Sequence, residues 1–156
     1  MTPGGDLADV RAALDSVTDP EIPVLTIRDL GILRDVSAEG DALTVTITPT
    51  YSGCPAMDTI RADIRSALSD VWTGSVEIAT VMWPAWTTDW MSEDGKRKLA
   101  AFGIAPPGPT GEADAVLCPR CRSDGPVLVS RFGSTACKAL YVCDSCGEPF
   151  DHFKAI

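Results

Sequence analysis

Two Cys-x-x-Cys pairs near the C-terminal end of the sequence constrain the fold more than any other feature. The pairs are Cys118–Cys121 and Cys143–Cys146, and residues 122–142 separate them. Each pair can present two thiolates to one metal ion, and a hairpin between the pairs would bring all four sulfurs together. Four thiolates suit tetrahedral Zn²⁺. The spacing therefore predicts a zinc ribbon, in which the metal supplies stability that so small a core lacks.

Other interpretations of the four cysteines stay open on spacing alone. A rubredoxin-like iron centre or an iron–sulfur cluster also uses four cysteines, whereas a redox dithiol would need one pair and not two. Binding of nucleic acid is disfavoured, because residues 112–156 hold five Lys or Arg against six Asp or Glu. A protein-docking ribbon is favoured. The additional Cys137 is interpreted as a small buried hydrophobe at a turn, with an accessory ligand near the metal as the alternative.

A change of composition near residue 103 divides the chain. The segment from Gly103 to Gly111 is rich in Pro and Gly, which favour neither helix nor strand. We expect one domain over residues 1–103, a linker over 104–113 and the ribbon over 114–156. The first domain carries most of the acidic excess of the chain, whose 13 Lys and Arg against 22 Asp and Glu give a net charge of −9. This balance argues against a broad surface for nucleic acid or anionic membrane.

The location expected from the sequence is the cytoplasm. No apolar stretch approaches the length of a membrane span, and Met1–Gly5 lacks the positive charge and apolar run of a secretory signal. Cysteines stay reduced in the cytoplasm, so paired cysteines there indicate metal ligands before disulfides.

The hydrophobic pattern predicts an α+β fold. Apolar residues at helical or alternating spacing give the order α-β-β-α-β-α in the first domain, a small α/β sandwich with helices on one face of its sheet. A β-rich ribbon follows. The expected helices lie near 7–17, 57–71 and 92–102, and the expected strands are 31–36, 43–48, 75–81, 127–132 and 139–142.

Cys54 differs from the ribbon cysteines. It lies in the connection from Thr48 to Pro55, and Pro55 opens the second helix, which places the thiol at or beside the N-cap. A helix N-terminus favours the thiolate, so a reactive or metal-binding sulfur is predicted. A Cys-His hydrolase is disfavoured, because His152 is the single histidine of the sequence. A buried structural cysteine is the alternative.

Two further segments are candidates for function. Pro20 and Pro23 stiffen the loop that holds Asp19 and Glu21, which are either functional carboxylates or solvated acids after a helix. A cluster of aromatic side chains follows the third strand, and it indicates either core packing or a partner surface. Its members are Trp83, Trp86 and Trp90.

Several of these segments resemble those of a known family. The segment from Asp19 to Gly31 and the Thr48–Pro55 loop are similar to SufT-like iron–sulfur maturation domains. Longer motifs resemble the D subunits of bacterial phenylacetyl-CoA epoxidases (PaaD, also called PaaJ), and the resemblance covers essentially the whole chain. These motifs are Pro84-Ala-Trp-Thr-Thr-Asp-Trp-Met91, Phe132-Gly-Ser-Thr-Ala-Cys-Lys-Ala-Leu-Tyr141 and Glu148-Pro-Phe-Asp151.

The resemblance implies a non-catalytic accessory subunit of the epoxidase in aerobic phenylacetate degradation. It implies a maturation factor that handles iron or an iron–sulfur cluster transiently through Cys54, Asp19 and Glu21, with structural zinc in the ribbon. The implied partners are the iron–sulfur flavin reductase subunit and the di-iron oxygenase subunits. The chain itself lacks the Glu-x-x-His signals of a di-iron bundle and a dinucleotide-binding glycine fingerprint. A stoichiometric docking subunit is the alternative.

Overall fold

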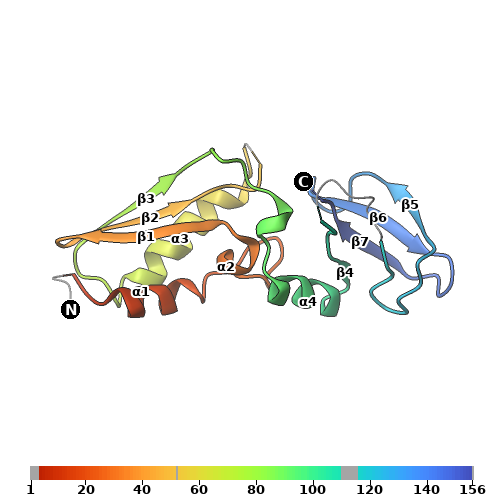
Figure 1. Ribbon diagram of the computed structural model, residues 1–156, viewed down its shortest axis with the longest axis horizontal. Helices are drawn as coiled ribbons and strands as arrows, with labels where there is room; N and C mark the ends of the chain where they lie inside the picture. The colour runs from red at the N-terminus through yellow and green to blue at the C-terminus, as the bar shows by residue number, and fades with distance from the viewer. Residues whose placement is uncertain (1–3, 52, 110–115, 156) are drawn as a thin grey trace. The chain divides into compact units, whose positions relative to one another are not determined.

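The computed structural model describes residues 4–51, 53–109 and 116–155 (Figure 1). The chain forms two compact units, Met1–Trp86 and Thr87–Ile156, and each unit contains its own β-sheet. No helix in the described ranges has the length and apolar character that crossing a membrane requires. Both the α+β class and the presence of a separate β-rich module, as expected from the sequence, are confirmed.

The first unit is built on a three-stranded sheet. Strands β1 (Leu33–Glu39) and β2 (Ala42–Ile47) form an antiparallel hairpin, and β3 (Ser75–Thr80) lies parallel to β2 on its other side. Gly40 turns the hairpin with a φ of 61°, a left-handed conformation that glycine adopts readily. Because β2 and β3 are parallel, the chain must cross over between them, and it does so through helix α3 (Ala56–Leu68).

The core of this unit lies between the sheet and two helices. Alternate residues of β2 are fully buried, as the sequence pattern predicts, and they face α3 and the N-terminal helix α1 (Leu7–Leu14). Figure 1 shows both helices on the same side of the sheet. The fully buried side chains from these three elements are Leu43, Val45, Ile47, Ile60, Ile64, Leu68, Val10 and Leu14.

A short helix, α2 (Ile27–Leu30), precedes the first strand and was not expected. Thr26 and Asp29 form a reciprocal capping box at its start, and Gly31 ends it with a φ of 79°. The strand predicted from residue 31 therefore begins only at Leu33, because Gly31 is the helix C-cap. The indole Nε1–H of Trp86 donates to the carbonyl oxygen of Leu30 at 2.8 Å, which ties the segment after β3 to this helix.

The second unit holds a four-stranded sheet. Its strands are β4 (Ile104–Ala105), β5 (Pro126–Ser130), β6 (Lys138–Cys143) and β7 (Pro149–Phe153). Their order in the sheet is β4-β7-β6-β5, with β6 antiparallel to both β5 and β7, and β4 parallel to β7. A 3-10 turn (η1, Thr88–Trp90) and helix α4 (Glu93–Ala101) come before the sheet in the chain.

The boundary between the units differs from the one that composition suggests. The structure assigns α4 to the second unit, and β4 occupies the first two residues of the segment expected to be a linker. Ile104 and Ala105 precede the first proline, so both keep a backbone N–H, and they pair with Asp151 and His152 of β7. Residues 110–113 of the expected linker lie outside the described residues.

Candidate functional site

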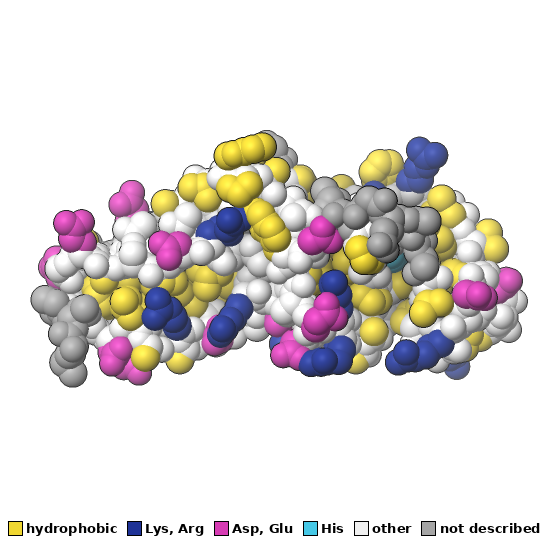
Figure 2. Space-filling model, viewed as in Figure 1, with side chains coloured by type: hydrophobic (Ala, Val, Ile, Leu, Met, Phe, Trp, Pro, Cys, Tyr) yellow, Lys and Arg dark blue, Asp and Glu magenta, His cyan; other side chains and the backbone are white. Residues whose placement is uncertain are grey.

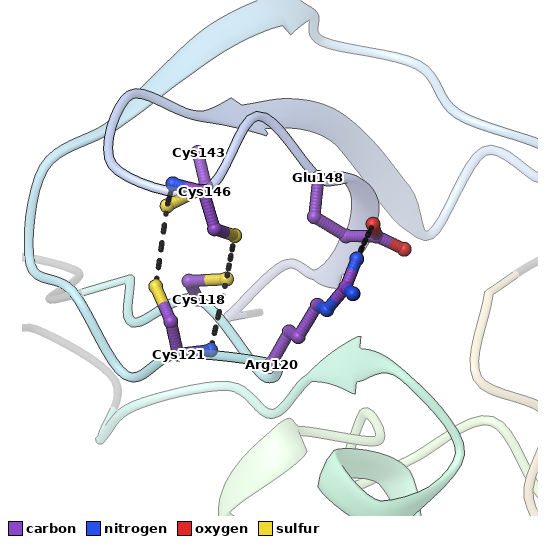
Figure 3. Close-up of polar contacts among 6 residues, drawn as sticks. All are labelled: Cys118, Arg120, Cys121, Cys143, Cys146 and Glu148. Atoms are coloured by element: carbon purple, nitrogen blue, oxygen red, sulfur yellow. Dashed lines mark hydrogen bonds and ion pairs between the residues drawn. The ribbon is translucent and has the colours of Figure 1, made fainter.

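The four ribbon cysteines converge on one point, as the sequence predicts. Their sulfur atoms all lie within 4.8 Å of one another. The Cys118 and Cys146 sulfurs are 3.7 Å apart, and those of Cys121 and Cys143 are 3.5 Å apart (Figure 3). A disulfide would need about 2.05 Å, whereas Zn–S bonds of about 2.3 Å in a tetrahedron place the sulfurs roughly 3.8 Å apart. The four thiols thus fit one tetrahedral metal ion and no disulfide.

The two Cys-x-x-Cys turns repeat the same local structure. In each turn the second cysteine's backbone N–H donates to the sulfur of the first at 3.5 Å. The carbonyl of the first cysteine accepts from the residue four positions later, at 2.8 Å from Arg122 and at 2.9 Å from Gly147. Both of these residues are left-handed, with φ values of 62° and 75°. The same backbone geometry therefore places both pairs of sulfur atoms.

The pKa values of Cys121, Cys143 and Cys146 are shifted in different directions. The backbone N–H of Cys146 is the main cause that lowers the pKa of Cys143, to about 6. The backbone of Ser123 also acts to lower the pKa of Cys121, but the Cys143 thiol, desolvation and the other two thiols outweigh it and raise that pKa to about 12. The Glu148 backbone acts to lower the pKa of Cys146, yet desolvation and the thiols of Cys143 and Cys118 raise it on balance. A metal ion that needs four thiolates must therefore displace protons.

The metal-ligand cluster is continuous with the small core of the second unit. Cys118 and Cys143 are buried with Ala105 and Phe150, and Tyr141 stacks on Phe150 at a centroid distance of 5.9 Å. The other two thiols of the group are exposed.

An ion pair that sequence reasoning did not single out joins the two turns. The Nη1 of Arg120 donates to Oε2 of Glu148 at 2.7 Å (Figure 3). A basic residue inside the first Cys-x-x-Cys pair and an acidic residue two positions after the second pair could have suggested this ion pair.

Cys137 is separate from the four converging thiols. It is buried, and its sulfur lies 3.0 Å from Oγ1 of Thr135. Its carbonyl accepts from the backbone N–H of Lys154 at 3.0 Å. These contacts favour the interpretation as a small buried residue of the turn before β6 over that of a metal ligand.

Cys54 lies immediately before helix α3. The N-cap of this helix is Pro55, which offers no side-chain hydrogen bond to the first turn. The thiol is partly exposed, and the backbone N–H of Cys54 donates to the Tyr51 carbonyl at 3.3 Å. Its own carbonyl accepts from Met57 at 3.3 Å. Cys54 therefore sits on a turn at the mouth of the helix, as expected, although the neighbouring Ser52 lies outside the described residues.

The carboxylate of Asp19 organises its own loop. Its Oδ1 accepts from the backbone N–H groups of Glu21 at 2.7 Å and Ile22 at 3.0 Å, and the side chain is buried. Glu21 is half-buried. Within the described ranges, the ribbon cysteines are the group of ligand side chains close enough to share a metal ion. The structure thus does not gather Cys54, Asp19 and Glu21 into a resident metal site.

The loops that follow β2 and β3 leave the sheet at the same end. The strands are parallel and in register at Ile47 and Thr80, and Val81 still bonds to the Ile47 carbonyl at 2.9 Å. The loop after β2 carries Cys54, and the loop after β3 carries the exposed Trp83. Figure 1 shows the two loops together, and Figure 2 shows hydrophobic side chains exposed over them.

The tryptophans divide between the two interpretations of the aromatic cluster. Trp86 is buried and belongs to the core of the first unit. Trp83 is 84% exposed, next to Met82 at 52%, and forms an apolar tip. Thr48 begins the Cys54 loop, and its hydroxyl is buried without a hydrogen-bond partner within the described part of the chain. The sequence did not indicate that this hydroxyl would be buried.

Two family models match the chain, one in each unit. Residues 7–81 match a family described as iron-sulfur cluster assembly protein. Residues 105–154 match the PaaD zinc beta ribbon domain. The second match covers Ala105 of β4, the strands β5 to β7 and all four converging thiols, so the cofactor expected from the spacing, zinc, is that of the matched domain.

One relative spans nearly the whole chain. An Escherichia coli (strain K12) protein, provisionally named as the D subunit of a 1,2-phenylacetyl-CoA epoxidase, is 49% identical over 95% of this chain and 92% of its own length. This chain belongs to the PaaD family of phenylacetyl-CoA epoxidase subunits. An Fe-S protein maturation auxiliary factor of Porphyromonas gingivalis (strain ATCC BAA-308 / W83) is 39% identical to this PaaD family member over 58% of the chain and 88% of the factor.

Two solved structures resemble the first part of this PaaD family member. A domain of unknown function from Bacillus anthracis has a TM-score of 0.54 and 32% identity over 59% of this chain and 89% of that one. A conserved hypothetical protein from Thermotoga maritima has a TM-score of 0.53 and 28% identity over 64% and 98% of the two chains. The resemblance stated from the sequence motifs is confirmed.

Proposed function

We propose that this PaaD family member is a non-catalytic maturation factor for the iron–sulfur or iron centres of a phenylacetyl-CoA epoxidase. The observation that carries the proposal is the partly exposed Cys54 at the uncapped start of α3. It lies in the part of the chain that matches an iron-sulfur cluster assembly family and relatives named as maturation factors. The cargo is iron or a cluster, and the acceptor is an apoprotein.

The geometry around Cys54 supports transient binding. One thiolate without further converging protein ligands binds iron weakly, so the remaining coordination positions stay available to the acceptor's own cysteines. In this proposal the iron or cluster dissociates from Cys54 when it is transferred to the acceptor. Asp19 is a positioning residue, because its Oδ1 is engaged with the loop backbone. Glu21 supplies a half-buried carboxylate from that loop, with no side-chain partner within the described part of the chain.

We propose a separate and permanent role for the ribbon thiols. Cys118, Cys121, Cys143 and Cys146 would hold structural zinc, which closes all four coordination positions with protein sulfur. A closed site leaves no position for substrate or water, so the ribbon's metal contributes stability and not chemistry. This division assigns the cargo to the first unit and the resident metal to the second.

The proposed acceptors are the iron–sulfur flavin reductase subunit and the di-iron oxygenase subunits of the epoxidase. The proposed compartment is the cytoplasm, where the thiols of both units stay reduced. The exposed Trp83 and Met82 on the loop beside the Cys54 loop give the first unit an apolar contact point for such an acceptor.

The test is a substitution at Cys54 in cells that express the epoxidase. Serine is nearly isosteric, but it cannot supply a soft thiolate to iron. Cys54→Ser should melt close to the unsubstituted protein, yet the co-expressed epoxidase should contain less iron and sulfide, and growth on phenylacetate should slow. Cys137→Ser is the matched control and should leave the iron content unchanged. Fully loaded epoxidase in the presence of Cys54→Ser would refute the transient-ligand role.

A stoichiometric docking subunit is the second candidate function. The observation that favours it is the exposed apolar surface of the ribbon, where Phe132 is 66% exposed. Purified active epoxidase distinguishes the two candidates. A maturation factor should be absent or substoichiometric in it, whereas a docking subunit should be present in fixed proportion.

A further inference from the structure

Strand β5 exposes apolar side chains along the edge of the ribbon sheet. Val127, Leu128 and Val129 are consecutive, and their exposures are 59%, 46% and 58%. In the described part of the chain, β5 pairs with β6 on one side and with no strand on the other. A free edge with apolar side chains offers its backbone N–H and C=O groups to another extended segment.

A pocket of about 350 Å³ lies beside this edge. Leu128 stands opposite Tyr141 in the β5–β6 register, and both line the pocket together with Phe132. Arg131, His152 and Lys154 line it as well. His152 is held in place by its Nδ1–H, which donates to the Ala105 carbonyl at 3.1 Å, and its ring lies edge-on to Tyr141. The pocket wall is therefore aromatic and built on three paired strands, β5, β6 and β7.

The charges at the pocket are all positive. The Nζ of Lys154 lies 4.5 Å above the Phe132 ring and donates to the Arg131 carbonyl at 2.9 Å. Neither the Arg131 guanidinium nor Lys154 has a carboxylate partner in the described ranges, and no acid lines the pocket. This cationic and aromatic spot lies on a chain of net charge −9. Figure 2 shows hydrophobic side chains exposed over β5 with a cationic side chain near them.

We propose that the β5 edge and this pocket form a docking site for an extended acidic segment of a partner protein. The segment would pair with β5 as a further strand, and one of its apolar side chains would enter the pocket. Carboxylates two residues to either side of that side chain would lie on the same face and pair with Arg131 and Lys154. The inference goes beyond the proposed maturation role, because it concerns the ribbon and is independent of Cys54.

The charge of the site selects among occupants. A nucleic acid would meet two cations here, where a site for it needs a broad basic surface. An acidic polypeptide satisfies both the two cations and the free backbone edge.

The experiment measures binding of labelled synthetic peptides to the zinc-loaded full chain by fluorescence anisotropy. The probe is a short peptide with one central Phe, Glu two residues to either side of it and Val at the positions between, so that Phe and both carboxylates share one face of the added strand. Its first control replaces each Glu with Lys, and its second carries N-methyl groups that remove the backbone donors. We expect the Glu peptide to bind with an affinity that falls as salt rises, and both control peptides to bind at least tenfold more weakly.

Charge reversal on the protein gives the matched comparison. Arg131→Glu combined with Lys154→Glu should weaken binding of the Glu peptide about tenfold or more, because attraction becomes repulsion at two positions. Arg97→Glu changes an exposed charge on α4 and should leave binding unchanged. Zinc content and the far-ultraviolet circular dichroism of each variant establish that the ribbon is folded.

Several results would overturn the proposal. Equal binding of the Glu and Lys peptides, or equal binding to the doubly charge-reversed protein, removes the acidic-segment claim. Equal binding of the N-methylated peptide removes the strand-addition claim. Dimers that form through β5 in sedimentation experiments would assign the edge to a second copy, and tighter binding of a DNA oligonucleotide than of the Glu peptide would assign it to nucleic acid.

Discussion

The two units of this protein are stabilised in different ways. The first unit closes a sheet with α1 and α3 over fully buried aliphatic residues such as Val45, Ile60 and Ile64. In the second unit, one small core cluster has four buried members, and two of these, Cys118 and Cys143, are candidate metal ligands. Cysteine is therefore placed in two ways in one chain, as four converging thiols beside a small core and as one partly exposed thiol at a helix start. We propose that the four thiols hold a resident metal and that the single thiol exchanges a ligand.

Removal of one ribbon ligand is expected to have the largest effect on this comparison. Cys143→Ser should abolish zinc retention and unfold the β5–β7 hairpins, because structural zinc in small modules contributes on the order of 10 kcal/mol to folding. The first unit should keep its fold, since its core contains no metal ligand. Hydrogen exchange followed by mass spectrometry reports the two units separately.

Cys137→Ser is the control for that experiment, since Cys137 lies outside the converging group. It should keep its zinc and the slow exchange of the ribbon. If Cys143→Ser instead accelerated exchange in β2 and α3 to the same extent as in β6, the division into a core-stabilised and a metal-stabilised unit would be wrong.

The reverse perturbation targets the apolar core of the first unit. Ile64→Ala removes a fully buried side chain of α3 and should destabilise the first unit by about 2–5 kcal/mol. Zinc content should stay at the unsubstituted level. Chemical denaturation monitored by circular dichroism, with zinc measured in parallel, checks both. The exposed neighbour Asp63→Ala should change stability by no more than about 0.5 kcal/mol, and loss of zinc in Ile64→Ala would contradict the separation.

The protonation of the thiols predicts how zinc binding depends on pH. The pKa values of Cys121 and Cys146 are raised, so both thiols keep their protons at pH 7, whereas Cys143, with a pKa lowered to about 6, is already a thiolate. Zinc must displace at least the two retained protons, so its affinity should rise at least about 100-fold per pH unit near neutrality. Below pH 6 the slope should steepen, because Cys143 is then protonated as well. Calorimetry in buffers of different ionisation enthalpy counts the released protons, and release of fewer than two at pH 7 would contradict this account.

The smallest expected effect comes from the backbone of the two cysteine turns. Arg122 and Gly147 occupy equivalent left-handed positions, but only glycine adopts this conformation without steric cost. Arg122→Gly should therefore strengthen zinc retention, and Gly147→Ala should weaken it, each by about 1 kcal/mol. Competition with a coloured zinc chelator measures both. The two variants should change zinc retention in opposite directions. A loss of retention in both would show that the contacts of the Arg122 side chain matter more than its φ.

Much of the fold follows from the sequence because its signals are local. The alternation of Leu43, Val45 and Ile47 predicts β2 and its buried face, and the spacing of the four cysteines predicts their convergence. Cys54 stands before α3 because the next residue, Pro55, is tolerated at the start of a helix but not in its interior.

The remainder depends on long-range pairing that a local pattern does not contain. Strand β4 exists because Ile104 and Ala105 pair with β7 far along the chain, although prolines follow directly. The position of Trp86 depends on the carbonyl of Leu30, and the pocket beside β5 depends on the β5–β6 register. Sequence motifs marked the residues of this pocket as distinctive without saying that they meet.

The central claim is that the two kinds of cysteine site hold metal on different terms, and metal retention tests it directly. The full chain would be loaded with zinc and ferrous iron without air, challenged with a moderate chelator and desalted, and its metals measured by mass spectrometry. The account predicts one retained zinc per chain, and iron that the chelator removes and that Cys54→Ser fails to take up while keeping its zinc. Iron uptake unchanged by Cys54→Ser, or zinc lost as readily as iron, would contradict it.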